Sequence, residues 1–292
     1  ANAADVAARL AAHHGGGHRR HQWHYTPLLH EKSRTGYVGL RNLGATCYMN
    51  SLLQQFRMVP AFSEAILGLR LGDESPPAED AAAAAQEQEA RALLAQLQEV
   101  FAFLHESERR FYDPAALCAK YRDYDGMPLN TSVQMDVDEF FNGLFDKLEL
   151  GLKRTPYARV LHDLFGGETV NQVIGKSDDC RHTSERDEGF FALSVEVKNK
   201  RSVLEGLEAY VEGEMLQGDN RYWCEGCGKL VDALKRCCVK RLPKNLIVHL
   251  KRFEFDFDLM KKSKLNDHCE VPTVIDMWPY TKEGLAAIDE AE

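Results

Sequence analysis

Apolar residues recur at the spacing of a helical face in three stretches of the first half of the chain. The first stretch runs from Tyr48 to Phe56. The second, residues 81–105, carries an apolar stripe made of Leu93, Leu94, Leu97, Val100, Phe101 and Leu104. The third begins after Ser132 and ends near Gly151, and its apolar residues are Val133, Val137, Phe140, Phe141, Leu144, Phe145 and Leu148. Because such stripes turn toward a core, we expect three packed helices here.

Two capping patterns mark further helices. Asp113 followed by Pro114 is typical of an N-cap and the first helical residue, and predicts a short helix. Ser202 and Glu205 form a capping box, and the apolar positions behind them predict a helix that reaches Leu216.

The second half of the chain changes to the alternation of strands. Apolar and polar residues alternate from Phe190 to Val197, as in a strand with one buried face. Further strands are predicted after Gly167 and over 235–240 and 246–253. Predicted helices in the first half of the chain are thus followed by predicted strands in the second half.

Composition narrows the class of protein. The chain has 292 residues, of which 44% are hydrophobic and 28% charged, as in an ordinary globular domain. No run of about 18 apolar residues occurs, so no membrane span is expected. The net charge of −9 argues against nucleic acid as the main partner. Acidic residues are concentrated over 64–149, which is either a solvated surface or a surface for a basic protein.

The eight cysteines lack the regular spacing of a disulfide framework. This favours a reducing compartment, the cytoplasm or the nucleus, where cysteines serve as catalytic or metal-binding residues. Residues 1–34 are rich in Ala, His and Gly, and we interpret them as a flexible flank without assigned chemistry. The chain starts at Ala1 rather than Met, which we interpret as the start of a fragment.

The most informative stretch is 39–51, which reads Gly-Leu-Arg-Asn-Leu-Gly-Ala-Thr-Cys-Tyr-Met-Asn-Ser. It predicts a turn built on Asn42 and Gly44, with Cys47 in the first turn of the helix that follows. The unpaired N–H groups of a helix N-terminus favour a nucleophilic thiolate. The amide of Asn42 would supply the donor of an oxyanion hole. Spacing alone is equally compatible with a small buried cysteine at a helix start.

The same stretch resembles the cysteine box of the ubiquitin-specific proteases, G-L-x-N-x-G-x-T-C-Y-x-N-S, and matches every fixed position. The resemblance extends to about Tyr280 and implies a papain-like cysteine peptidase that cleaves after the C-terminal glycine of ubiquitin. It implies Cys47 as nucleophile, Asn42 as oxyanion donor and no cofactor for catalysis. It also implies an α+β fold with a helical thumb over 35–156, followed over 157–292 by β-rich fingers and an incomplete β palm. Ubiquitin and ubiquitinated proteins would be the partners.

A second stretch, Gln134-Met135-Asp136-Val137-Asp138-Glu139-Phe140, resembles the box Q-x-D-x-x-E-F of the same family. The resemblance implies that Asp136, and more weakly Asp138, grip the arginine-bearing tail of ubiquitin while Gln134 shapes the channel. Carboxylates pair with guanidinium groups through charge-assisted hydrogen bonds. The alternative is that these acids only complement the dipole of a helix N-terminus.

Cys224 and Cys227 form a Cys-x-x-Cys pair, which is half of a zinc site. The family takes its other pair from a Cys-x-x-Cys about 45 residues upstream, where this chain has Cys180 but Ser177 in place of the first cysteine. The fourth ligand is then either absent or His182, and Cys237 or Cys238 is a weaker candidate. Three interpretations stay open: a structural zinc site, a ribbon that folds without metal, and a redox-active dithiol. The Ser177 substitution predicts weak or substoichiometric zinc.

A papain-like cysteine needs a base. The family supplies it from a G-H-Y-x-x-Y box, which does not occur within residues 1–292. Either the chain continues, or the protein binds ubiquitin without cleaving it. Recruitment of His249 or His268 is a weaker alternative.

Overall fold

The computed structural model describes residues 35–71, 81–123, 125–256 and 260–291. The flank over 1–34 and the loop expected at 72–80 lie outside the described residues. The chain divides between Leu161 and His162 into two compact units, which are described separately here. The first is mainly helical and the second mainly strands, and the α+β class is confirmed.

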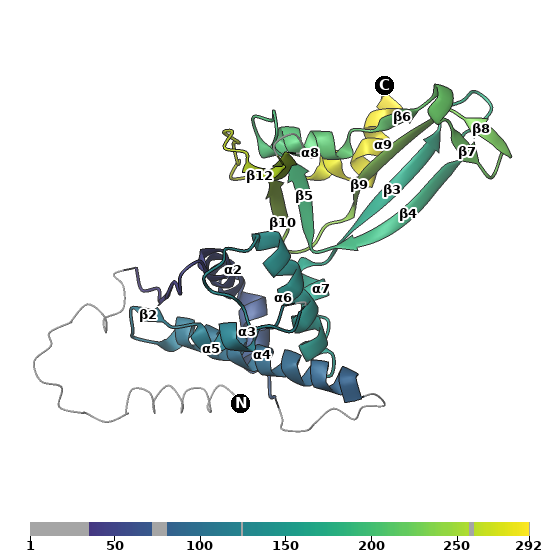
Figure 1. Ribbon diagram of the computed structural model, residues 1–292. Helices are drawn as coiled ribbons and strands as arrows, with labels where there is room; N and C mark the ends of the chain where they lie inside the picture. Colours follow the sequence, from purple (N-terminus) through teal and green to yellow (C-terminus); the bar gives the residue numbers. More distant parts are fainter. Residues whose placement is uncertain (1–34, 72–80, 124, 257–259, 292) are drawn as a thin grey trace, which may run out of the picture. The chain divides into compact units, whose positions relative to one another are not determined.

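The first unit consists of helices with one small sheet (Figure 1). Its parallel two-stranded sheet joins β1 to β2. In chain order, the elements are β1 (Gly39–Leu40), α2 (Cys47–Arg57), α3 (Pro60–Gly68), α4 (Ala81–Glu106), β2 (Phe111–Tyr112), α5 (Ala115–Lys120) and α6 (Val137–Leu152). α7 (Val160–Phe165) lies at the boundary between the units.

Phenylalanine rings hold the helices of the first unit together. The Phe56 ring of α2 lies 5.6 Å from the Phe62 ring of α3 and 5.4 Å from the Phe145 ring of α6. Phe62 in turn meets Phe101 of α4 edge to face at 5.9 Å. All four side chains are buried. Aromatic pairs at these distances stabilise a core beyond the area they bury. The helix that starts at Cys47 is therefore held by its packing against α3 and α6.

Two close contacts show how tightly α4 is packed. The buried Gln98 donates from Nε2 to the carbonyl oxygens of Ile66 and Leu69, which satisfies the C-terminal end of α3. On another face of α4, a Cβ added at Gly151 of α6 would lie 3.0 Å from the carbonyl oxygen of Ala90. The two helix backbones therefore approach each other closely at Gly151.

The second unit is built on an antiparallel sheet with strand order β4-β3-β9-β6 (Figure 1). A parallel pair joins β5 to β10, and two hairpins pair β7 with β8 and β11 with β12. The strands are β3 (Gly167–Gly175), β4 (Thr183–Phe190), β5 (Ala192–Glu196), β6 (Glu214–Leu216), β7 (Tyr222–Cys224), β8 (Lys229–Val231), β9 (Ala233–Arg241), β10 (Ile247–Lys251), β11 (Phe253–Asp256) and β12 (Lys261–Lys264). The helical elements are α8 (Val203–Val211), η2 (Gly218–Asn220), η3 (Trp278–Tyr280) and α9 (Lys282–Ala291).

α8 and α9 both pack on β9 of this sheet. The core under α8 contains Val170, Val195, Leu207 and Cys238, each almost completely buried. α9 is held by two ion pairs: Arg236 of β9 lies 2.9 Å from Asp289, and Lys282 lies 2.7 Å from Glu185 of β4. The Lys282 ammonium and its hydrogen bond lower the pKa of Glu185.

Several element boundaries differ from the sequence predictions. The helix predicted to reach Leu216 ends at Val211, and Leu216 belongs to β6, because its segment pairs with β9 instead. Val133 was expected on the apolar face of α6 but is exposed. It lies before the helix, because Asp136 is the N-cap and α6 starts at Val137. The short helix near Asp113 starts at Ala115. We did not predict α7, β4 or α9.

Candidate active site and metal-binding cluster

Cys47 is the first residue of α2, and its side chain is exposed. The turn before it is tied to a distant segment, because the N–H of Ala45 donates to the carbonyl oxygen of Thr131 at 2.7 Å. Gly44 has a φ of +133°, and a Cβ there would lie 2.8 Å from the same carbonyl oxygen. Only glycine suits both the backbone angle and the close approach. The turn that presents Cys47 therefore has a defined position against residues 131–132.

The side chain of Asn42 is oriented by donors that converge on its oxygen. The backbone N–H groups of Gly44 and Thr46 donate to Asn42 Oδ1 at 3.1 and 3.2 Å. The hydroxyl of Thr46 also donates to it at 3.2 Å. Since a backbone N–H can only donate, the atom that faces these groups must be the amide oxygen. The amide nitrogen Nδ2 is therefore turned away from the turn, and no hydrogen bond to it occurs among the described residues.

The helix behind Cys47 is packed firmly. Tyr48 is buried, and its ring meets the Phe140 ring of α6 edge to face at 5.4 Å. Burial raises the pKa of Tyr48 to about 12, with smaller contributions from Cys118, Cys47 and Glu139. A neutral phenol at this position adds no charge beside the cysteine.

The second sequence box, residues 134–140, begins three residues after Thr131, whose carbonyl oxygen accepts the hydrogen bond from Ala45. Asp136 is the N-cap of α6, and its Oδ1 accepts a hydrogen bond from the N–H of Asp138 at 2.8 Å. Asp136 and Asp138 are half-buried, whereas Gln134 is exposed. Asp136 therefore has a structural function as a cap, and its second carboxylate oxygen accepts no hydrogen bond within the described part of the chain. The two sequence boxes are in contact through the rings of Tyr48 and Phe140, and the bond between Ala45 and Thr131 holds the turn close to the start of the second box.

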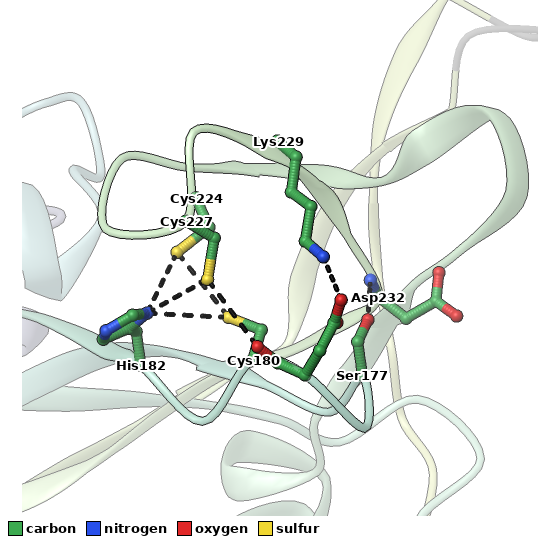
Figure 2. A network of polar contacts seen from close by, with 8 residues as sticks. Ser177, Cys180, His182, Cys224, Cys227, Lys229 and Asp232 are labelled. Carbon is green, nitrogen blue, oxygen red and sulfur yellow. Dashed lines mark hydrogen bonds and ion pairs between the residues drawn. The ribbon is translucent and has the colours of Figure 1, made fainter.

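The second unit holds a cluster of four metal-binding groups: Cys180, His182, Cys224 and Cys227 (Figure 2). Their donor atoms all lie within 4.8 Å of one another. The Sγ atoms of Cys180 and Cys224 are 3.6 Å apart, and His182 Nδ1 lies 3.8, 3.6 and 3.2 Å from the sulfurs of Cys180, Cys224 and Cys227. A tetrahedral zinc ion with ordinary bond lengths separates two sulfurs by about 3.8 Å, and sulfur from nitrogen by about 3.6 Å. The cluster is therefore able to hold a metal ion of that size.

Two turns bring these four residues together. Cys180 and His182 lie between β3 and β4, whereas Cys224 and Cys227 belong to the β7–β8 hairpin. The Ser177 hydroxyl is used elsewhere: its Oγ accepts a hydrogen bond from the N–H of Asp232 at 3.0 Å (Figure 2). The two turns are also joined by an ion pair between Lys229 and Asp179 (Figure 2).

The thiols of Cys224 and Cys227 differ in pKa. Burial opposes ionisation of Cys224, but hydrogen bonds from the Cys227 N–H, the neighbouring thiols and His182 outweigh it and lower its pKa to about 7. The hydrogen bond with Cys180 and burial raise the pKa of Cys227 to about 12. The set thus favours one thiolate surrounded by donors, and cation binding would displace the remaining protons.

The other cysteines and histidines singled out from the sequence lie elsewhere in the fold. Cys238 is buried in the core of the second unit, and Cys237 Sγ lies 3.5 Å from the hydroxyl of Tyr210. His249 lies in β10 with Nδ1 3.2 Å from the Ser194 hydroxyl. His268 is exposed. All eight cysteines are free thiols.

Sequence reasoning missed two residues of the candidate active site. Thr46 is completely buried and contacts Asn42, and Thr131 supplies the carbonyl oxygen that fixes the turn. The position of Thr46 directly before the cysteine was a readable signal. The contact with Thr131 could not be predicted, because it depends on how the two segments pack.

In the described ranges, we find no helix with the length and apolarity needed to cross a bilayer.

Comparison with known proteins extends the match over nearly all of the described residues. A family model described as ubiquitin carboxyl-terminal hydrolase matches residues 38–291. Human ubiquitin carboxyl-terminal hydrolase 9Y is 34% identical over 92% of this chain, and human ubiquitin carboxyl-terminal hydrolase 34 is 35% identical over 96%. The Drosophila melanogaster ubiquitin carboxyl-terminal hydrolase puf is 38% identical over 97%. The chain spans only 12%, 7% and 7% of the lengths of these three relatives.

The mixed helix-and-sheet fold, with a cysteine box at the start of α2, is that of a papain-like cysteine peptidase. The chain belongs to the ubiquitin carboxyl-terminal hydrolase family.

Proposed function

We propose that this chain carries the nucleophile part of a cysteine-type deubiquitinase, which hydrolyses isopeptide or peptide bonds after the C-terminal glycine of ubiquitin. The observation that carries the proposal is the pairing of an exposed Cys47 at the start of α2 with an Asn42 amide of fixed orientation. The partners would be ubiquitin and ubiquitinated proteins, and the protein would act in the cytoplasm, the nucleus or both.

In the proposed reaction, the Cys47 thiolate attacks the glycine carbonyl and forms a tetrahedral intermediate. Collapse of this intermediate breaks the bond to the amine, which takes up a proton as it leaves, and gives the thioester acyl-enzyme. Water then hydrolyses the acyl-enzyme. Negative charge develops on the carbonyl oxygen during both steps, and the Nδ2 group of Asn42 is the donor proposed to meet it. No cofactor is needed for this chemistry. The proton-accepting base is assigned to no histidine of the described residues.

Substrate binding is proposed to use the second box. Asp136 and Asp138 would hold the arginine-bearing tail of ubiquitin, and Gln134 would line its path. Three observations support this: the half-buried carboxylates at the start of α6, the exposed Gln134, and the bond between Ala45 and Thr131. The first unit would serve as the thumb of the domain, and the second as its fingers and part of its palm.

We further propose that Cys180, His182, Cys224 and Cys227 bind one structural zinc ion. The spacing of the four donor atoms supports this, and so does their chemistry, because thiolates and imidazole are the preferred ligands of zinc. The ion would join the β3–β4 turn to the β7–β8 hairpin and take no part in the reaction.

The enzymatic proposal is tested with the full-length protein and a fluorogenic ubiquitin C-terminal amide. Cys47→Ala should abolish hydrolysis, whereas Cys269→Ala, a cysteine control in the second unit, should leave it unchanged. Asn42→Ala should lower kcat by about 10²–10³ with little change in ubiquitin affinity. A parent protein that binds ubiquitin but shows no Cys47-dependent hydrolysis would refute the proposal and identify a ubiquitin-binding module instead.

A further inference from the structure

Thr46 is the N-cap residue of α2, but its hydroxyl does not cap the helix. An N-cap threonine usually accepts a hydrogen bond from a backbone N–H in the first turn. In this chain no side-chain cap bond forms at the start of α2. The Thr46 Oγ is turned backward instead: it donates to Asn42 Oδ1 at 3.2 Å and accepts from the Leu43 N–H at 3.1 Å. The hydroxyl therefore belongs to the turn and leaves the first N–H groups of the helix open.

Burial strengthens the effect of this arrangement. Thr46 is 0% exposed, whereas Asn42 is exposed to solvent. An exposed amide side chain would ordinarily rotate among several orientations. A completely buried hydroxyl cannot exchange its hydrogen bond for one to bulk water without exposing the turn. Thr46 thus restrains Asn42 from the protein side, while the opposite side of the amide remains accessible.

We propose that Thr46 is a positioning residue, which orients the Asn42 amide so that Nδ2 points toward the substrate carbonyl before the reaction begins. This inference rests on the proposed function, and it adds a residue that acts through Asn42 without touching the substrate. Preorganised donors stabilise a developing oxyanion most because they need no reorganisation at the moment of reaction. Loss of the hydroxyl removes one of the three hydrogen bonds to Oδ1 and leaves the two from the backbone.

The expected kinetic effect is therefore partial. A neutral hydrogen bond contributes enough to change an equilibrium by about threefold to tenfold. Thr46→Val, which keeps the shape and removes the hydroxyl, should lower kcat by about that factor with KM nearly unchanged. Thr46→Ser, which keeps the hydroxyl, should restore most of kcat. Ser51→Ala is the matched control, because it removes a hydroxyl of α2 that bonds to the Tyr48 carbonyl oxygen and not to Asn42.

The decisive measurement is a double-mutant cycle in the full-length protein. If Thr46 acts through Asn42, Thr46→Val should lower kcat in the parent but change it less than about twofold in the Asn42→Ala background. An equal loss of kcat in both backgrounds would overturn the inference, since it would show a merely structural function. Thr46→Ala provides the same comparison if the valine variant does not fold.

A second readout does not depend on turnover. The side-chain amide signals of Asn42, identified by their loss in Asn42→Asp, are followed by NMR in the chain of residues 1–292. Thr46→Val should lower the order of this amide, and Thr46→Ser should preserve it. An unchanged order of the Asn42 side-chain amide in Thr46→Val would overturn the inference. If the parent shows no Cys47-dependent hydrolysis, the proposed function fails, and the NMR result still decides whether Thr46 orients Asn42.

Discussion

Replacement of His182 by alanine tests the metal-binding cluster most directly. The β7–β8 end of the second unit has a very small core, which consists of Cys180, Cys224 and Val231 with Tyr222 and Cys227 packed against it. Three of these residues are proposed ligands, so little apolar packing would remain to hold the two turns together without a metal. A bound ion would therefore supply most of the local stability.

The size of the effect follows from the ligand set. Loss of a residue that merely supports a ligand already lowers metal affinity by about 10–100-fold, so loss of a direct ligand should cost about 100-fold or more. When zinc is far above its dissociation constant, a 100-fold loss removes about 2.7 kcal/mol of stabilisation. For a unit of this size, the melting temperature should fall by roughly 10 °C.

The assay is zinc content after dialysis against metal-free buffer, together with thermal unfolding with and without a chelator. We expect about one zinc per chain in the parent, a clear deficit in His182→Ala, and no change in the control variant His268→Ala. Chelation should destabilise the parent much more than His182→Ala. Equal zinc content in the parent and His182→Ala would show that the histidine is not a ligand. A parent that contains no zinc and unfolds at the same temperature with and without the chelator would show that the cluster folds without metal.

Three further outcomes are expected. Asp136→Asn keeps the helix cap but removes the charge, so it should leave stability unchanged and weaken ubiquitin binding by about tenfold or more; equal affinity would exclude a charge-dependent role. Gly44→Ala introduces strain at φ +133° and a contact of 2.8 Å with Thr131, so denaturant unfolding should show a loss of at least about 1–3 kcal/mol. Gly151→Ala should also destabilise, because the crowding at Ala90 exceeds the helix-propensity gain of about 1 kcal/mol; increased stability would contradict this.

The parts of the fold that the sequence predicted are those decided by local pattern. The apolar stripe of α4 predicted its helix over 81–105, and α4 spans Ala81–Glu106. The capping box of Ser202 predicted the start of α8, and its hydroxyl accepts a hydrogen bond from the Glu205 N–H. These signals lie within a few residues of the element they specify, so no distant contact was needed to interpret them.

The parts that were missed depend on distant partners. β4 has no apolar alternation and is a strand because it pairs with β3 along its whole length. α9 was not predicted either, and this helix is held by Arg236 of β9 and Glu185 of β4.

The candidate site divides in the same way. The sequence motif singled out Cys47 and Asn42, and it assigned Asn42 both to the turn and to the oxyanion donor. In the structure Oδ1 accepts the hydrogen bonds of the turn and Nδ2 points away from it, so the proposed donor role would not compete with the turn. His182 remained an open choice because its approach to Cys227 depends on two turns that are far apart in sequence.

The exposed outer strand β4 has a consequence for how this protein behaves at high concentration. An outer strand carries unpaired backbone groups along its free side, and such an edge is a template for strands of other molecules. β4 forms the edge of its sheet, and its exposed residues include Glu185, Arg186, Asp187 and Glu188. A second chain that paired with this edge would have to bring its own strand against closely spaced charges of both signs and desolvate them. The charged residues of β4, which give it no apolar alternation, thus protect the edge of the sheet from self-association.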